Sequence, residues 1–336
     1  MKRRKWRIGV KPASMATGAA LLGALLMGGA VAQEEGAESF AEWREGVRSE
    51  ALELGISAKI FDTAFADVEP IPRVIELDRS QPEVTLTFDQ YVERVVPESR
   101  VEKGRKLLAE HRELLEPIGR TYGVPPRFIV ALWGIETNFG QYLGGFPVIA
   151  SLATLAYDGR RSAYFHQELL HALRILEDGH ITSDAMMGSW AGAMGQSQFM
   201  PSSFVNYAVD HDGDGKRDIW GTQGDVFASA ANYLAQAGWR AGETWGRRVA
   251  LPSGFDHALA GLEVKKTLAE WQALGLRRAD GSDLPQADIS GSVVLPGGEG
   301  GPVFLVYNNY RTIMRWNRSF YFATSVGLLA DGIGRR

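Results

Sequence analysis

Hydrophobic positions follow a helical spacing along most of the chain up to about residue 245. The segments AESFAEWREGVRSEALELG and SAKIFDTAFADV predict helices between residues 33 and 70, and residues 99–123 predict one long, charged amphipathic helix. Between them, TLTFDQYVERVV begins with alternating residues and fits either a strand or a helix. Pro125 and Pro126 open the next helix, because proline is well tolerated in a first turn.

The pattern changes after about residue 246. Short β-like runs (RRVAL, GSVVL and GPVFLVY) are separated by the turn-rich segments ADGSDLPQADISG and PGGEGG. An aromatic-rich helix is predicted from about Tyr310 to Leu329. We therefore expect a mainly α (α+β) protein, with a helical lobe over residues 33–125 and a helical core over 126–246. A small β-containing lobe over 247–309 and a C-terminal helix within 310–336, packed on the core, complete this prediction.

Residues 1–32 have the features of a signal peptide. A basic start, MKRRKWR, precedes the apolar stretch ATGAALLGALLMGGAVA, which ends in small residues suited to cleavage before Gln33. The alternative is an uncleaved anchor helix, and Arg3-Arg4 alone is a weak sign of twin-arginine export. This segment contains six of the 36 basic residues and none of the 40 acidic ones, so the remaining chain has a net charge of about −10.

That negative charge argues against a nucleic-acid partner. The chain has no cysteine, which excludes disulfides and a lipid anchor on an N-terminal cysteine. Together with the signal peptide, these features predict an exported protein without a lipid anchor, located in the periplasm.

The segment PPRFIVALWGIETNFG places one carboxylate, Glu136, in an apolar helix. Four of its apolar residues lie within about 60° of one another on a helical wheel and form the predicted core stripe: Phe128, Leu132, Ile135 and Phe139. Glu136 lies about 80° from Phe128, at the edge of that stripe, where a helix would line a groove. Partial burial raises the pKa of a carboxyl and suits it to general acid catalysis. The alternative is a structural ion pair with Arg160 or Arg161.

A second segment, SWAGAMGQSQFMPSSF, combines glycines with neutral polar side chains. Glycines allow a ligand to approach the backbone closely, and amide and hydroxyl groups suit sugar hydroxyls and acetamido groups. A tight helix–helix crossing through small residues is the alternative, although Gln196, Ser197 and Gln198 make the run polar for a packing seam.

A third segment, DHDGDGKRDIW, has the spacing of an EF-hand-like loop. The candidate Ca²⁺ ligands are Asp210, Asp212, Asp214, the carbonyl of Lys216, and Asp218. Position 12, where a bidentate Glu is expected, is Gly221, and Asp225 could close the site if the loop is longer. One structural calcium ion is predicted; a solvated acidic turn is the alternative.

These segments, together with ASAANYLAQAGW and in this order, resemble the lytic murein transglycosylase B family, glycoside hydrolase family 103, over roughly residues 38–330. The resemblance implies a lysozyme-like helical core with a helical lobe, a small β-containing lobe and an EF-hand-like calcium site. It also implies cleavage of the β-1,4 bond between N-acetylmuramic acid and N-acetylglucosamine in peptidoglycan glycan strands, with a 1,6-anhydro product.

The resemblance assigns Glu136 as the single catalytic acid and base. The substrate's own acetamido group would assist, as in the substrate-assisted exceptions to two-carboxylate glycosidases. It further suggests the saccharide contacts Ser189, Gln198 and Phe199, the lactate or peptide contacts Arg160 and Arg161, and the further cleft residues Tyr233 and Asn317. Trp316 and Phe322 stand where tyrosines are expected, so a hydroxyl role there is absent or filled by another residue, such as Tyr321.

Two other functions remain open at this point. A lysozyme-type hydrolase would release ordinary reducing ends, and a non-catalytic murein-binding protein would bind saccharide without turnover. Cell-wall synthesis or remodelling proteins are possible partners in either case.

Overall fold

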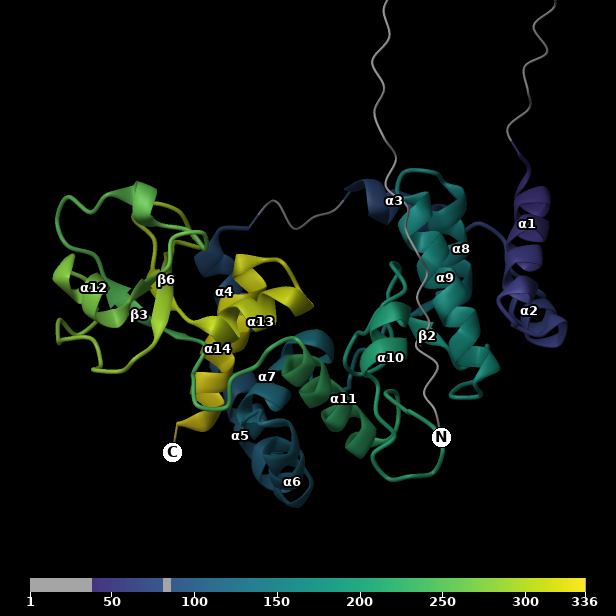
Figure 1. Ribbon diagram of the computed structural model, residues 1–336. Helices are drawn as coiled ribbons and strands as arrows, with labels where there is room; N and C mark the ends of the chain where they lie inside the picture. Colours follow the sequence, from purple (N-terminus) through teal and green to yellow (C-terminus); the bar gives the residue numbers. More distant parts are fainter. Residues whose placement is uncertain (1–37, 81–85, 336) are drawn as a thin grey trace, which may run out of the picture. The chain divides into compact units, whose positions relative to one another are not determined.

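Helices form most of the chain that the computed structural model describes, which is residues 38–80 and 86–335 (Figure 1). The predicted signal peptide lies outside these residues. The helices are α1 (Phe40–Glu53), α2 (Ala58–Ala64), α3 (Pro72–Ser80), α4 (Phe88–Val95), α5 (Glu98–Glu110), α6 (Arg112–Tyr122), α7 (Pro126–Thr137), α8 (Val148–Tyr157), α9 (Ser162–Glu177), α10 (Pro201–Tyr207), α11 (Gln223–Gln236), α12 (Leu268–Ala273), α13 (Asn308–Trp316) and α14 (Phe320–Gly334). Among the described residues, none of these helices combines the length and apolar character needed to cross a membrane.

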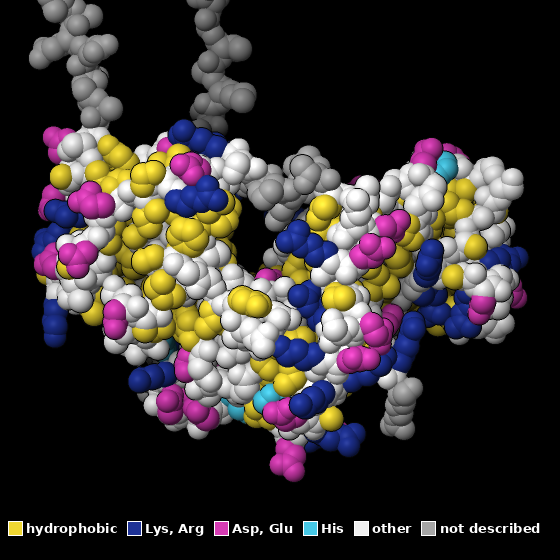
Figure 2. Space-filling view, turned by 180° about the vertical axis from the view of Figure 1, so that it is seen from behind, with side chains coloured by type: hydrophobic (Ala, Val, Ile, Leu, Met, Phe, Trp, Pro, Cys, Tyr) yellow, Lys and Arg dark blue, Asp and Glu magenta, His cyan; other side chains and the backbone are white. Residues whose placement is uncertain are grey.

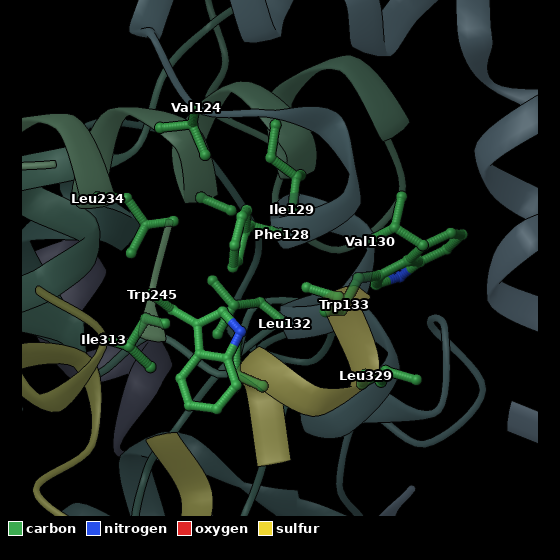
Figure 3. Close-up of a cluster of buried hydrophobic side chains, with 14 of the residues drawn as sticks. Val124, Phe128, Ile129, Val130, Leu132, Trp133, Leu234, Trp245, Ile313 and Leu329 are labelled. Atoms are coloured by element: carbon green, nitrogen blue, oxygen red, sulfur yellow. The ribbon is translucent and has the colours of Figure 1, made fainter. Parts of the chain in front are cut away.

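Helix α7 lies at the centre of one hydrophobic core. It packs against α5, α6, α11 and α14, so residues 128–134 are buried around the whole circumference of the helix. Figure 3 shows Phe128, Leu132 and Trp133 of α7 in one cluster with Leu234 of α11, Ile313 of α13 and Leu329 of α14. The predicted single stripe was therefore too narrow, because the helix is enclosed by neighbours rather than lying on a surface.

A second hydrophobic core forms around the antiparallel pair α8 and α9. Helices α2 and α10 pack on α9, and α3 packs on α8. Between α8 and α9 the chain turns through Arg160 and Arg161. A two-stranded ribbon of β1 (Phe146–Pro147) and β2 (Met187–Gly188) joins the segment before α8 to the glycine-rich segment.

The β-like runs form a five-stranded antiparallel sheet in the order β4-β6-β7-β3-β5. Its strands are β3 (Gly246–Ala250), β4 (Lys266–Thr267), β5 (Arg277–Arg278), β6 (Ser290–Val294) and β7 (Val303–Val306). Strand β7 is apolar throughout because both faces are covered. Phe304 and Val306 join the core around α7, while Leu305 packs with Trp271 of α12 on the other face.

Three predicted elements differ in detail. The ambiguous segment TLTFDQYVERVV contains helix α4, capped by Thr87, whose hydroxyl accepts the backbone N–H of Gln90. The helix predicted over 99–123 is two helices that meet at His111, and Pro117 inside the second cannot donate a backbone hydrogen bond. The predicted final helix is also two helices, because the helix is interrupted at residues 317–319 and Ser319 caps α14.

Candidate active site

Glu136 lies in the last turn of α7, and the helix ends directly after it. Asn138 is a left-handed C-cap with φ of 50°, and Phe139 and Gly140 continue with φ of 63° and 77°. Phe139 nevertheless keeps its ring buried, because Gly134 leaves room for it. A Cβ on Gly134 would lie 2.7 Å from the Phe139 ring. The sequence WGIETNFG therefore stops the helix where its carboxyl reaches the edge of the core.

The Glu136 carboxyl is half-buried and has one defined donor. The indole Nε1–H of Trp316 donates to Glu136 Oε1 at 2.7 Å. Burial raises the pKa of Glu136 to about 8, and the Trp316 hydrogen bond lowers it by a smaller amount. At neutral pH this carboxyl therefore holds its proton, as a general acid requires.

The alternative ion pair of Glu136 with Arg160 or Arg161 is wrong. Both guanidinium groups instead bind Asp78 of α3, a carboxylate only 2% exposed. Arg160 Nε donates to Asp78 Oδ2 at 2.6 Å, and Arg161 donates to Asp78 Oδ1. Burial alone would raise the pKa of Asp78, but the bonds from the two arginines outweigh this and lower it. The arginine side chains remain about half exposed, at 50% and 41%, so their outer parts are open to a ligand.

Trp316 belongs to an aromatic cluster with Phe199 and Tyr233. Its ring centroid lies 5.2 Å from that of Phe199 and 4.7 Å from that of Tyr233. Phe199 is only 2% exposed, so it supports the Trp316 ring and offers little surface to a saccharide. The Tyr233 hydroxyl donates to the carbonyl of Arg315 at 2.7 Å, which ties α11 to the end of α13. This cluster therefore fixes the indole that contacts Glu136.

The glycine-rich segment is a folded loop between β2 and α10, so the predicted alternative of a helix–helix crossing is wrong. Ser189 Oγ accepts the backbone N–H of Ala193 at 3.0 Å. Gly188 is required there, because a Cβ would lie 2.2 Å from the Ala193 carbonyl. Gln198 donates to the carbonyls of Leu143 and Gly195 at 3.1 and 3.0 Å, and its side-chain oxygen remains available as an acceptor.

The side chain of Gln196 forms hydrogen bonds inside the protein, which its polarity alone did not indicate. Its Oε1 accepts the indole N–H of Trp133 in α7 at 2.7 Å, and its Nε2 donates to the carbonyl of Trp220 at 2.8 Å. Its backbone N–H also bonds the Ile219 carbonyl at 2.8 Å. The side chain is 7% exposed, so it links the helix that carries Glu136 to the end of the acidic loop.

The acidic loop brings three of its predicted ligands together. Carboxylate oxygens of Asp210, Asp212 and Asp214 lie within 4.8 Å of one another, a spacing that hard oxygen ligands of one cation require. Asp218 instead accepts the backbone N–H groups of Trp220 and Gly221, both at 2.9 Å. The Asp218 carboxylate thus stabilises its own turn, as Asp210, Asp212 and Asp214 also do by accepting backbone N–H groups of the loop.

Asp225, on the first turn of α11, is 1% exposed. It accepts the backbone N–H groups of His211 and Asp218, each at 2.7 Å, and so ties the two ends of the loop together. Burial raises its pKa, although both hydrogen bonds oppose that shift. Asp225 therefore holds the two ends of the loop together, and its predicted role as a ligand stays a prediction.

Two further side chains, Asn317 and Tyr142, are exposed. Asn317 is exposed in the break between α13 and α14, where its Oδ1 accepts the Ser319 N–H at 3.0 Å. Tyr142, which sequence reasoning missed, is 71% exposed. It precedes Leu143, whose carbonyl accepts the Gln198 amide. The signal for Tyr142 was present as an aromatic residue among glycines after the helix.

On the face shown in Figure 2, basic and acidic side chains are interspersed with hydrophobic ones.

Comparison with known proteins gives consistent matches. A model of the transglycosylase SLT domain matches residues 39–331. Membrane-bound lytic murein transglycosylase B of Escherichia coli is 32% identical over 257 residues, covering 73% of this chain and 66% of that protein. This chain therefore spans about two thirds of the length of that curated relative.

Solved structures agree with these matches. SltB3 of Pseudomonas aeruginosa, determined in complex with NAG-anhNAM-pentapeptide, is 49% identical with a TM-score of 0.86, covering 88% of this chain and 80% of that one. Escherichia coli SLT35, determined in complex with calcium, is 27% identical with a TM-score of 0.75, covering 86% and 92%. The similarities confirm the predicted mainly α (α+β) fold with a lysozyme-like core. Because the domain model spans nearly all the described residues, this chain belongs to the lytic murein transglycosylase B family.

Proposed function

We propose that this chain is a lytic transglycosylase that cleaves the β-1,4 bond between N-acetylmuramic acid and N-acetylglucosamine in peptidoglycan. The observation that carries the proposal is the state of Glu136, a half-buried carboxyl whose pKa is raised to about 8 in a chain of this family. SltB3, with which the chain shares 49% identity, was determined with a NAG-anhNAM ligand, which contains the 1,6-anhydro sugar that such a reaction forms.

The reaction uses one carboxyl twice. Neutral Glu136 gives its proton to the glycosidic oxygen as the bond from that oxygen to C1 of the muramyl sugar breaks. The resulting carboxylate then takes the proton of the C6 hydroxyl, whose oxygen bonds to C1 and closes the anhydro ring. Support from the substrate's acetamido oxygen at C1 removes the need for a second protein carboxylate.

Substrate contacts are proposed on both sides of this carboxyl. Ser189 and Gln198 offer polar groups for sugar hydroxyls, and Asn317 and Tyr233 lie near the break that carries Trp316. Phe199 acts beneath the site, by supporting the indole of Trp316. Arg160 and Arg161, held by Asp78, are suited to the lactate or peptide carboxylates of the muramyl side chain.

A calcium ion is proposed for the acidic loop. The carboxylates of Asp210, Asp212 and Asp214, with the carbonyl of Lys216, form an oxygen set suited to Ca²⁺. Asp218 and Asp225 stabilise the loop around that set through backbone N–H groups. The ion would supply structural stability, because the reaction proceeds at Glu136. Export to the periplasm is proposed from residues 1–32 and from the location of peptidoglycan.

The test is digestion of purified sacculi followed by mass spectrometry of the products. Wild-type protein is expected to release anhydro-ended fragments, each lighter by one water than the hydrolysed product. The variant Glu136→Gln is expected to lose at least about 100-fold in rate while remaining folded, because amide nitrogen is not an acid. Products with ordinary reducing ends would establish a lysozyme-type hydrolase, and undiminished turnover by Glu136→Gln would refute the assigned acid.

A further inference from the structure

No pattern in the sequence indicated that the side chain of Trp316 contacts Glu136. Its Nε1–H lies 2.7 Å from Glu136 Oε1, although α7 and α13 are separated by 180 residues in the sequence. The family resemblance leads one to expect a tyrosine at this position. A tyrosine hydroxyl both donates and accepts a hydrogen bond, whereas an indole N–H only donates. Trp316 can therefore donate a hydrogen bond to Oε1 of Glu136 but cannot accept one from it.

We propose that Trp316 is a positioning residue, which fixes Oε1 of Glu136 as the hydrogen-bond acceptor and leaves Oε2 as the oxygen that carries the transferred proton. The inference rests on the proposed catalytic role of Glu136. A neutral carboxyl has one hydroxyl and one carbonyl oxygen, and the carbonyl oxygen is the better acceptor. A donor that cannot accept therefore favours the form in which Oε1 is the carbonyl and Oε2 bears the hydrogen.

The position of the indole is itself well defined. Phe199 and Tyr233 pack against its ring, and the Tyr233 hydroxyl holds the carbonyl of the preceding residue, Arg315. Helix α13 ends at Trp316, so the side chain reaches Glu136 from the break between α13 and α14. An indole held in this way keeps Oε1 in one orientation through both proton transfers.

The same bond becomes stronger when Glu136 ionises. Hydrogen bonds to a charged acceptor are stronger than those to a neutral one. Trp316 therefore stabilises the carboxylate that forms after the first proton transfer, and this is the species that must accept the C6 hydroxyl proton. Loss of the indole N–H should slow catalysis and make the acid harder to ionise.

The test compares Trp316→Phe and Trp316→Tyr with the wild type, using a soluble anhydro-forming muropeptide substrate over pH 5–10. In Trp316→Phe we expect kcat to fall roughly tenfold, with KM nearly unchanged, because one hydrogen bond to a charged group is lost. The alkaline limb of kcat/KM should move to higher pH by about half to one unit. Trp316→Tyr, which regains a donor, should recover part of the rate.

The other ionisable groups near the site remain the same in Trp316→Phe, so the pH profile is read from that variant, whereas Trp316→Tyr adds a phenol and serves for the rate at neutral pH. Tyr233, whose ring contacts Trp316, has its pKa raised to about 12 by burial and stays neutral over this range. Lys103 donates to the carbonyl of Asn138 at 3.3 Å, and neither variant changes that contact. A displaced alkaline limb can therefore be assigned to the lost indole bond.

Trp245→Phe is the matched control. The Trp245 indole also donates to a carboxylate, Asp331 Oδ2 at 3.0 Å, but contacts no part of the proposed site. It should lower the melting temperature and leave the pH profile unchanged. If Trp316→Phe has the wild-type profile and rate while Glu136→Gln is inactive, the positioning inference is wrong and the proposed function stands. If Glu136→Gln is active, the proposed function itself fails.

Discussion

A carboxyl that holds its proton at pH 7 should weaken the fold that contains it. In the unfolded chain Glu136 ionises near its ordinary pKa of 4.5, whereas in the folded chain burial raises the pKa to about 8. Between these two values the unfolded state gains the free energy of ionisation and the folded state does not. The free energy of unfolding should therefore fall as the pH rises from 4.5 to 8.

The magnitude follows from the two pKa values. At about 1.4 kcal/mol for each tenfold change in proton affinity, the difference between 4.5 and about 8 corresponds to roughly 5 kcal/mol. Glu136 is only half-buried, so solvent screening reduces this value, and we expect about 2–4 kcal/mol above pH 8. Glu136→Gln should not show this loss of stability because its amide does not ionise in the unfolded chain, while its amide oxygen can still accept the Trp316 N–H.

The assay is thermal unfolding of wild-type protein and Glu136→Gln at a series of pH values from 4 to 9. The two melting temperatures should nearly coincide at pH 4, and the variant should be higher by roughly 4–8 °C at pH 8 and above. Glu102→Gln, an exposed substitution on α5, removes the same formal charge and serves as the control. A difference between Glu136→Gln and the wild type that does not vary with pH would show that Glu136 has no raised pKa, and the proposed acid role would lose its physical basis.

Four further outcomes are expected. Wild-type kcat/KM on a soluble muropeptide should decline above about pH 8, because Glu136 then loses its proton; a profile that is flat to pH 10 contradicts this. Calcium should raise the melting temperature of the wild type and leave that of Asp212→Ala/Asp214→Ala unchanged; an equal rise in both would refute the placement of the ion. Asp78→Ala should lower the free energy of unfolding by about 1–3 kcal/mol, measured in urea, since two half-exposed arginines lose a buried partner. That loss should shrink as the pH falls below about 4, because the arginines lower the pKa of Asp78 and their benefit disappears when it is protonated. Tyr142→Ala should raise KM several-fold on glycan strands with little change in kcat if this exposed ring stacks on a sugar; an unchanged KM would exclude that contact.

The helical spacing and the glycine and proline positions predicted most of the architecture. Strand β7 was recognised from its continuous apolar run, because a strand covered on both faces has no polar side. The breaks at His111 and at residues 317–319 were missed, since periodicity continues across a short interruption when both helices face the same core.

For the candidate site, the sequence indicated some features and missed several contacts. The partial burial of Glu136 was expected from its place in an apolar helix, and the clustering of three loop carboxylates from their spacing, because both signals are local in the sequence. The partners of Arg160 and Gln196 were not accessible in this way. Each depends on a residue more than 20 positions away, Asp78 in one case and Trp220 in the other, and only the tertiary fold brings them together.

Because α7 is buried on all sides, substitutions on this helix should destabilise the fold, whereas some exposed positions elsewhere should tolerate substitution. A substitution on that helix meets neighbours on every side, and truncating a buried leucine or phenylalanine typically costs about 2–5 kcal/mol. The segments 141–145 and 317–319, in contrast, carry exposed side chains and contribute little to either core. Directed evolution toward altered glycan preference should therefore find its tolerated mutations at the exposed positions Gln141, Tyr142, Asn317 and Arg318. Gly144, where a Cβ would lie 2.0 Å from the Gly188 carbonyl, and Ser319, which caps α14, should not tolerate substitution.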